Sequence, residues 1–212
     1  MKIDMGIPNL NKLTSDGVPR GNMILISGDY GTGKTIFSLQ FLAKGVKEWG
    51  EPGIFISFID GRKTLLRDAK TFNWQLKRFE NESNIKILGG YPERLEGFSE
   101  KAAINGEKLI EEIIKKAKEA EAERMAIDGL KQFSNKFKDD KTFKAGIAKL
   151  RNALAEQNCT TILTSKPDFG IEEIVDGVII LHYEGQLEKT RAIEIRKMRR
   201  TEHTDRVCPF EI

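Results

Sequence analysis

The stretch GDYGTGKT, residues Gly28–Thr35, joins the apolar run MILIS, Met23–Ser27, to the helix-like run TIFSLQFLAKGVKEW, Thr35–Trp49. Its spacing is G-x-x-x-x-G-K-T, the Walker A pattern of phosphate-binding loops. Glycines allow consecutive backbone N–H groups to face phosphate oxygens at the positive end of a helix. The stretch therefore predicts a strand, a phosphate-binding loop and a helix, in that order.

The loop predicts a nucleotide ligand, ATP or ADP, together with Mg²⁺. Lys34 is expected to neutralise phosphate charge, and the hydroxyl of Thr35 is expected to bind the metal. A glycine-rich structural turn is the alternative. The predicted nucleotide contacts are Gly28, Asp29, Tyr30, Gly31, Thr32, Gly33, Lys34, Thr35 and Ile36.

Length and composition favour one α/β domain over residues 1–212, because no Gly/Ser/Pro-rich linker or internal repeat divides the chain. No apolar leader and no run of about 18 apolar residues is present, so we expect a cytoplasmic protein without a membrane partner. Cys159 and Cys208 lack metal or redox spacing and are expected to be ordinary thiols. The 35 basic and 32 acidic residues give a net charge of +3, which does not demand a nucleic-acid partner.

Apolar periodicity predicts alternating strands and helices. The expected fold is a mostly parallel central sheet flanked by helices, with an antiparallel hairpin at the C-terminal end around a Glu-Gly-Gln turn. The predicted strands are Met23–Ser27, Ile54–Phe58, one from Ile85, RMAID ending at Asp128, TTILTS ending at Ser165 and two more within 177–198; the predicted helices are Lys34–Trp49, one from Arg62, Glu107–Ala120 and Thr142–Glu156.

Two aspartates are candidates for the rest of a nucleotide site. Asp128 ends an apolar strand, where a carboxylate can orient Mg²⁺, although a cap before Gly129 is the alternative. Asp60 follows the second core strand at the edge where parallel sheets meet ligands, so it is a candidate to orient the attacking water. A solvent-facing loop aspartate is its alternative interpretation.

Six stretches in this order resemble a single KaiC-like domain of the RecA ATPase superfamily: 6–42, GEPGIFISF, RMAIDGL, CTTILTS, VDGVIIL and the closing KMRRTEHTDRVCPFEI. The resemblance covers nearly the whole chain and implies a RecA-type P-loop fold. It also implies ATP with Mg²⁺ at subunit interfaces of a ring-type homo-oligomer, of hexamer type.

The resemblance further implies a role for the K-M-R stretch, Lys197, Met198 and Arg199. In such rings the lysine and the arginine reach the γ-phosphate held by the neighbouring subunit and stabilise its charge. An exposed basic cluster with Arg196, Arg200 and Arg206 is the alternative.

Three departures from the family pattern bear on hydrolysis. KaiC-like domains usually carry two adjacent glutamates where this chain has Ile59 and Asp60. Lys166 replaces a glutamate or glutamine that senses the γ-phosphate, and a lysine cannot accept a hydrogen bond from water. Asp29 and Tyr30 occupy loop positions that are often glycine and proline.

Three functions compete. The first is a slow ATPase whose cycle controls the shape or the protein partner of a homo-oligomer. The second is a nucleotide-binding scaffold or sensor with negligible turnover, which Ile59 and Lys166 favour. The third is a DNA-acting recombinase, for which the basic and aromatic segment KQFSNKFKDDK, Lys131–Lys141, is the candidate contact, while the acidic segment SKPDFGIEEIVDG opposes it.

Overall fold

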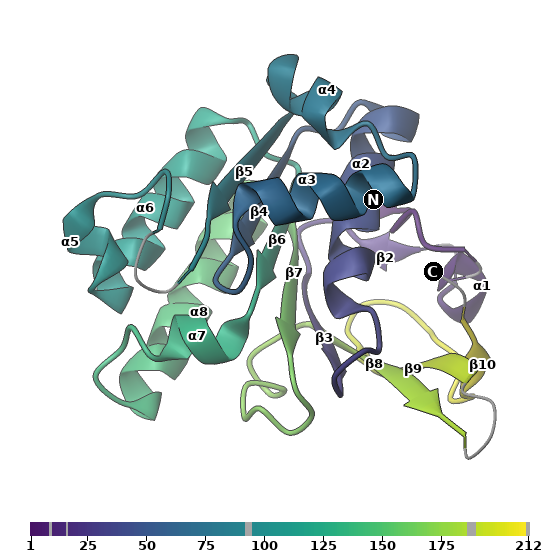
Figure 1. Cartoon of the computed structure of the whole chain (residues 1–212). Helices are drawn as coiled ribbons and strands as arrows, with labels where there is room; N and C mark the ends of the chain where they lie inside the picture. Colours follow the sequence, from purple (N-terminus) through teal and green to yellow (C-terminus); the bar gives the residue numbers. More distant parts are fainter. Residues whose placement is uncertain (9, 16, 92–94, 186–189, 211–212) are drawn as a thin grey trace.

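The computed structural model describes residues 1–212 except 9, 16, 92–94, 186–189 and 211–212 (Figure 1). Within this part of the chain no helix is long and apolar enough to span a membrane. The elements are β1 (Lys2–Ile3), α1 (Leu10–Leu13), β2 (Val18–Pro19), β3 (Met23–Gly28), α2 (Lys34–Trp49), β4 (Gly53–Ser57), α3 (Arg62–Thr71), α4 (Leu76–Asn81), β5 (Ile85–Gly89), α5 (Glu100–Ala103), α6 (Gly106–Glu119), β6 (Arg124–Asp128), α7 (Leu130–Ser134), α8 (Asp140–Glu156), β7 (Thr160–Ser165), β8 (Gly177–Glu184), β9 (Thr190–Met198) and β10 (Cys208–Pro209).

The central sheet has eight strands in the order β10-β9-β8-β3-β7-β6-β4-β5. Strands β8, β3, β7, β6, β4 and β5 run parallel, whereas β9 and β10 are antiparallel to their neighbours. The predicted α/β fold, mostly parallel with antiparallel strands at its C-terminal end, is confirmed. Because β3 lies between β7 and β8, its loop is near the middle of the sheet (Figure 1).

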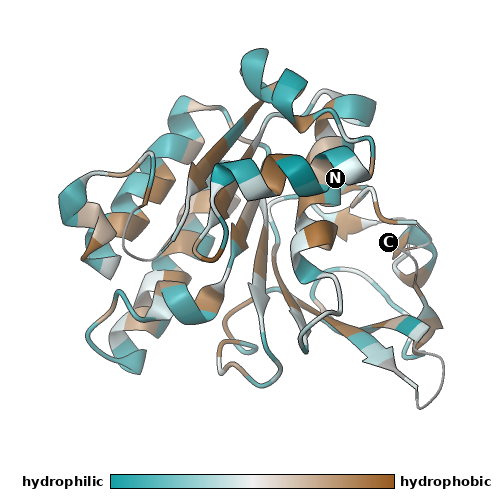
Figure 2. Cartoon of the chain, viewed as in Figure 1, coloured by the Kyte–Doolittle hydropathy of each residue, from teal (hydrophilic) through white to brown (hydrophobic). Residues whose placement is uncertain are grey.

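Helices cover both faces of the sheet. One apolar core lies beneath α2, α3 and α4, and a second lies beneath α6, α7 and α8. The strands between these layers are largely apolar, and polar residues gather on the outer faces of the helices (Figure 2). This double covering explains the near-continuous apolar runs of the parallel strands.

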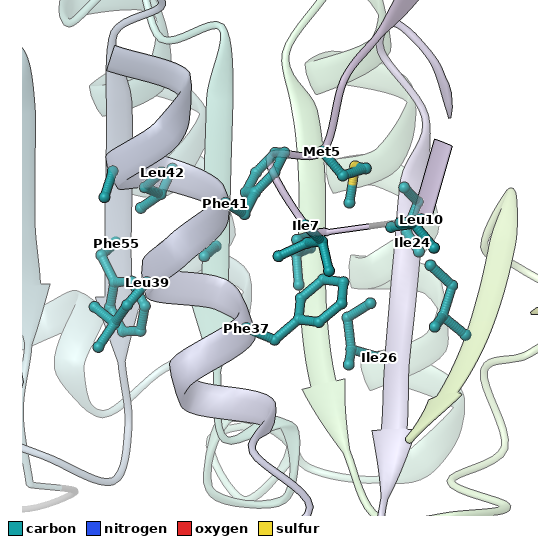
Figure 3. Close-up of a cluster of buried hydrophobic side chains, with 14 of the residues drawn as sticks. Met5, Ile7, Leu10, Ile24, Ile26, Phe37, Leu39, Phe41, Leu42 and Phe55 are labelled. Carbon is teal, nitrogen blue, oxygen red and sulfur yellow. The ribbon is translucent and has the colours of Figure 1, made fainter. Parts of the chain in front are cut away.

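Helix α2 fixes the position of the phosphate loop. Apolar side chains of the helix pack on β3, β4 and the N-terminal segment, as Figure 3 shows. Phe37 and Phe41 are completely buried, and truncating either to alanine is expected to cost about 3–5 kcal/mol. The labelled side chains of this core are Met5, Ile7, Leu10, Ile24, Ile26, Phe37, Leu39, Phe41, Leu42 and Phe55. The start of α2 is therefore held firmly beside the end of β3.

A buried arginine joins the start of β6 to α2. The guanidinium of Arg124 donates to the Glu51 carboxylate at 2.5 Å and to the carbonyl oxygens of Phe41 and Asp4 at 3.0 and 2.8 Å. It also lies 4.7 Å from the centre of the Phe41 ring. Burial lowers the pKa of Arg124, while the charge of Glu51 opposes that shift. These contacts anchor one end of the strand whose other end is Asp128.

The predicted elements are confirmed, with bounds that differ by one or two residues. Strand β4 is Gly53–Ser57 rather than Ile54–Phe58. Helix α8 begins before Thr142 because the Asp139 carboxylate caps it, accepting a 2.7 Å hydrogen bond from the Thr142 N–H. The predicted Glu-Gly-Gln turn extends to residue 186, which lies outside the described residues.

Candidate functional site

Four segments meet at the carboxyl edge of the parallel strands, where ligands bind in open α/β sheets. They follow β3, β4, β6 and β7, and they border a cleft of about 890 Å³. The cleft is lined by Tyr30, Gly31, Gly33, Lys34, Thr35, Ile36, Ile59, Asp60, Asp68, Phe72, Asp128, Gly129, Leu130, Lys131, Gln132, Thr164, Ser165, Lys166, Phe169 and Arg191.

The phosphate loop needs its glycines for two reasons. Gly31 and Gly33 have φ angles of +77° and +97°, which L side chains rarely adopt. Gly28 is close to β8, so a Cβ there would lie 2.5 Å from the carbonyl oxygen of Leu181. Gly33 is the N-cap of α2, which places the free N–H groups of the first helical turn beside the cleft.

Lys34 is folded back over its own loop. Its ammonium donates to the carbonyl oxygens of Gly28 and Asp29 at 2.8 and 2.7 Å. Burial lowers the pKa of Lys34, an effect that Asp128 and Asp29 oppose and Lys166 reinforces. The ammonium is therefore a partly desolvated cation inside the loop, which suits it to bind phosphate oxygens.

Thr35 and Asp128 are in direct contact, as the proposed metal site requires. The Thr35 hydroxyl donates to one oxygen of the Asp128 carboxylate at 2.9 Å, and the Thr164 hydroxyl donates to the other at 2.5 Å. Asp128 is only 1% exposed, and burial raises its pKa against the effect of these two hydrogen bonds. A divalent cation would relieve this cost, because hydroxyl and carboxylate oxygens are the ligands that Mg²⁺ prefers.

Asp60 lies in the same cleft. The Ser57 hydroxyl accepts hydrogen bonds from the backbone N–H groups of Asp60 and Ile59, at 2.9 and 3.2 Å, and so shapes the turn after β4. Burial raises the pKa of Asp60, and the nearby charge of Asp68 raises it further. Asp60 is thus placed where a water-orienting carboxylate is expected, and its role stays a prediction.

Ile59 puts an apolar side chain in the cleft where the family pattern has a carboxylate. The side chain of Ile59 is 41% exposed. It lies close to Gly129, which follows β6, since a Cβ on Gly129 would lie 2.6 Å from the Cγ1 atom of Ile59. The cleft therefore has one carboxylate from this segment instead of two adjacent ones.

Lys197 and Arg199 do not join this cleft. Lys197 pairs with Val178 near the amino end of β8, and the Arg199 N–H donates to the Asp176 carbonyl oxygen just before that strand. The phosphate loop follows the opposite ends of the strands, roughly 16 Å away at about 3.3 Å per residue. A contact between these cations and a nucleotide therefore requires the nucleotide of another subunit.

The side chains of Lys197 and Arg199 nevertheless bind the same short segment of backbone, residues 172–175. The Lys197 ammonium donates to the carbonyl oxygens of Glu172 and Val175, both at 2.7 Å, and Arg199 donates to that of Glu173 at 3.3 Å. Burial lowers the pKa of Lys197, and the charge of Arg199 adds to the effect. Both side chains thus lie against the segment 172–175, although β9 ends one residue before Arg199.

Two departures in the sequence meet at the mouth of the cleft. Tyr30 is 81% exposed, and the Lys166 ammonium lies 4.1 Å from the centre of its ring. Asp29 is also exposed, but its side chain does not line the cleft. The acidic side chain therefore leaves room for phosphates.

Two cations of the cleft were not predicted from the sequence to belong to it, although Lys131 was named as part of the candidate DNA contact. Lys131 lies just after the RMAIDGL stretch, so its position could have been inferred from Asp128. Arg191 stacks 4.6 Å from the centre of the Tyr183 ring. On sequence alone it is one more charge on a half-exposed strand, and only the pairing of β8 with β9 brings it to the cleft.

The two phenylalanines of the segment 131–141 pack on the apolar core. Phe133 is completely buried, and its ring lies 5.4 Å from that of Phe137. Phe137 packs against α6 and α8, because a Cβ on Gly106 or Gly146 would lie within 2.8 Å of its ring. Base stacking by these side chains, on which the third candidate function partly depends, is therefore not supported, and a DNA contact through the basic residues of the segment stays untested.

The cysteines carry no visible chemistry. Both Cys159 and Cys208 are free, and burial raises the pKa of Cys159 to about 12, so its thiol stays protonated.

In the described part of the chain no group of three or more His, Cys, Asp or Glu residues could hold a metal ion. A metal at Thr35 and Asp128 would therefore need oxygen atoms of a ligand or of water, as Mg²⁺ has in nucleotide sites.

Comparison with known proteins agrees with this geometry. A family model described as "ATPase: KaiC" matches residues 3–212. The circadian clock oscillator protein KaiC of Parathermosynechococcus lividus is 32% identical over 222 residues, which cover 100% of this chain and 41% of that protein. KaiC of Parasynechococcus marenigrum is 33% identical over 220 residues, covering 99% and 43%. The chain thus spans less than half the length of these relatives.

A solved structure is similar throughout. The crystal structure of a KaiC-like protein from the hyperthermophilic archaeon Pyrococcus horikoshii matches with a TM-score of 0.86 and 32% identity, covering 100% of this chain and 95% of that chain. The predicted RecA-type fold is confirmed by this match.

Proposed function

Because this chain belongs to the KaiC family of ATPases, we propose that residues 1–212 form one domain that binds ATP or ADP with Mg²⁺ and hydrolyses ATP slowly. The nucleotide state would control the shape of a ring-type homo-oligomer or its binding of a protein partner. The observation that carries the proposal is the contact of Thr35 with Asp128 at 2.9 Å, beside Lys34 and the free N–H groups of α2.

Each residue has a physical task in this proposal. The loop N–H groups and Lys34 bind the β- and γ-phosphates, and bound Mg²⁺ would neutralise charge on the same oxygens. Thr35 and Asp128 would hold the metal. Asp60 would orient water toward the γ-phosphate. Lys197 and Arg199 would act on the nucleotide of the neighbouring subunit, since they lie at the far edge of their own sheet.

Slow turnover follows from the residues after β4. Ile59 offers no oxygen to water, so Asp60 must act without a neighbouring carboxylate. A nucleotide-binding scaffold with negligible turnover is the second candidate, and the same isoleucine favours it. A cytoplasmic location is part of the proposal, which the two free cysteines favour.

The test combines turnover with assembly. Phosphate release from ATP is measured at steady state, beside sizing of the protein with ADP and with a non-hydrolysable ATP analogue, each with and without Mg²⁺. We expect slow, Mg²⁺-dependent release and a different assembly for the two nucleotides. Asp128→Asn should remove most of the Mg²⁺ dependence of binding, and Glu111→Gln, an exposed carboxylate on α6, should not.

Binding without phosphate release would favour the scaffold. Failure to bind either nucleotide at millimolar concentration would contradict both candidates.

A further inference from the structure

We propose that Lys166 is a second phosphate-binding cation from the same subunit, which moves from the Tyr30 ring to the γ-phosphate and makes the protein prefer ATP over ADP. The inference rests on the proposed function of the cleft, and it concerns a residue that departs from the family pattern.

The position of Lys166 in the sheet selects the phosphate end of the nucleotide. It follows Ser165, the last residue of β7, which lies between the strand of the phosphate loop and the strand of Asp128. Two residues before Lys166, the hydroxyl of Thr164 donates a hydrogen bond to the Asp128 carboxylate at 2.5 Å. Asp128 and Thr35 would hold the metal ion that neutralises phosphate charge, so Lys166 starts beside the phosphate end of a bound nucleotide and away from its base and ribose.

The ammonium of Lys166 has only a weak partner. It lies 4.1 Å from the centre of the Tyr30 ring, and no carboxylate of the described residues is within ion-pair distance of it. A cation over an exposed aromatic ring gains about two- to fivefold in an equilibrium, whereas a hydrogen bond between charged groups gains about 10- to 100-fold. A γ-phosphate would therefore take the ammonium from the ring.

The charged residues that line the cleft also favour an anion beside Lys166. Among the residues that line the cleft, four are cations, Lys34, Lys131, Lys166 and Arg191, and three are carboxylates, Asp60, Asp68 and Asp128. The charge of Lys166 already acts on Lys34, adding to the lowering of its pKa. Two ammonium groups in one cleft repel each other, and an anion between them, such as a γ-phosphate with two negative charges, offsets that repulsion.

The side chain of Tyr30 acts as the resting place of the ammonium and not as a phosphate ligand; the nucleotide contact predicted at this position would be made by the backbone N–H, which Tyr30→Leu keeps. Its ring is at the rim of the cleft, largely exposed to solvent. The ring keeps Lys166 near the loop without an ion pair that phosphate would have to break. Cleavage of the bond to the γ-phosphate would remove the ligand, so the ammonium would return to the ring when ADP remains.

The test is an equilibrium titration of wild type and four variants with ADP and with a non-hydrolysable ATP analogue, both with Mg²⁺. In Lys166→Gln the affinity for the ATP analogue should fall about tenfold or more, while that for ADP changes less than about twofold. Lys166→Arg should keep the preference. Tyr30→Leu should also keep it, because the ring only holds the ammonium.

Lys131→Gln is the matched control, since it removes the same charge from the same cleft. It should alter the ratio of the two affinities less than about twofold. Equal losses for both nucleotides in Lys166→Gln, or the same ratio change in both glutamine variants, would overturn the role of Lys166 and leave the proposed function standing. If wild type bound neither nucleotide, the proposed function itself would fail and this inference with it.

Discussion

The hydroxyl of Thr35 donates a 2.9 Å hydrogen bond to the carboxylate of Asp128, which follows it by 93 residues in the chain. One residue belongs to the first turn of α2 and the other is the last residue of β6. The two proposed metal ligands are therefore already in contact, and each is fixed by a buried element behind it. Little reorganisation is needed before a metal and phosphates can bind, which reduces the entropic cost of binding.

Removal of the loop cation should weaken binding of both nucleotides. Lys34→Ala leaves the loop N–H groups to face several phosphate charges alone, so we expect the affinities for ATP and ADP to fall about 10- to 100-fold in calorimetry. Lys47→Ala is the control, because Lys47 lies on the same helix but is exposed at its far end. Equal affinities of wild type and Lys34→Ala would mean that the loop is not a phosphate cradle.

Loss of the carboxylate after β4 should affect turnover but not binding. We expect Asp60→Asn to lower phosphate release by about 100-fold, since a general base typically contributes a factor of this size. Burial, followed by the charge of Asp68, raises the pKa of Asp60. Turnover should therefore fall as the pH falls through that raised pKa, at a higher pH than for an ordinary aspartate.

The variant Asp68→Asn tests whether the raised pKa of Asp60 causes the fall of turnover in acid. It removes the like charge that helps to raise the pKa of Asp60, so the acid side of the pH profile should move to lower pH. An unchanged rate in Asp60→Asn would assign Asp60 to the solvent-facing alternative.

Restoration of the second carboxylate should increase turnover. Ile59→Glu places a carboxylate beside Asp60 in the cleft, where it can accept a hydrogen bond from the attacking water. We expect phosphate release to rise about tenfold or more, within the range of acid–base effects. Ile59→Gln is the control of similar size, and an equal rise in both variants would show that the charge is not what matters.

The basic tail should act between subunits. Arg199→Ala is expected to abolish most turnover yet keep nucleotide binding, whereas Lys34→Ala is expected to lose turnover and to bind nucleotide about 10- to 100-fold more weakly. A mixture of the two inactive variants should regain phosphate release, because some interfaces then pair an intact loop with an intact tail. Subunit exchange is followed by sizing of differently tagged chains. If the mixture exchanges subunits but stays inactive, the trans-acting role is wrong, and the alternative interpretation of these residues as an exposed basic cluster is favoured.

One carboxylate should support the fold at the far edge of the sheet. Asp176 is 1% exposed and accepts hydrogen bonds from Arg151 at 2.6 Å and from the Met23 N–H at 3.1 Å. Burial alone would raise the pKa of Asp176, but these two partners outweigh it and lower that pKa. Asp176→Asn should cost about 3 kcal/mol, or roughly 6–12 °C in Tm for a chain of this size.

The pH dependence of this effect has a definite sign. Because the folded-state pKa of Asp176 is lowered, its stabilisation is present above the ordinary aspartate pKa and is lost as the pH falls through the lowered value. The Tm difference between wild type and Asp176→Asn should therefore shrink in acid. The control Glu111→Gln removes an exposed pair with Lys149 and should change stability by less than about 1 kcal/mol.

Local patterns in the sequence were sufficient for the strands of five or more residues, the long helices and the loop of Lys34, but not for the two-residue strands β1, β2 and β10. Asp128 could be predicted because it ends an apolar strand, and carboxyl ends of parallel strands share one edge. Other features depend on how distant strands pair. The register of β8 with β9 places Arg191 at the cleft and Lys197 at the opposite edge, although both belong to one strand.

The burial of two phenylalanines in the segment 131–141 could not be inferred from the sequence either. The sequence KQFSNKFKDDK predicts an exposed basic and aromatic loop, but Phe133 and Phe137 pack between helices that are separated from them in the chain. Composition cannot distinguish a base-stacking phenylalanine from a core phenylalanine, because both occur beside lysines.

The far-edge position of Lys197 and Arg199 also has a consequence for stoichiometry. If these cations act on the nucleotide of a neighbouring copy, as proposed, each chain would carry one half of a catalytic pair at each edge of its sheet, and contacts between copies would be head to tail. A pair of copies would complete one of its two sites and leave the other without cations, whereas a closed ring completes every site. Specific activity per chain would then rise with the number of copies in an open row and reach its maximum only on closure.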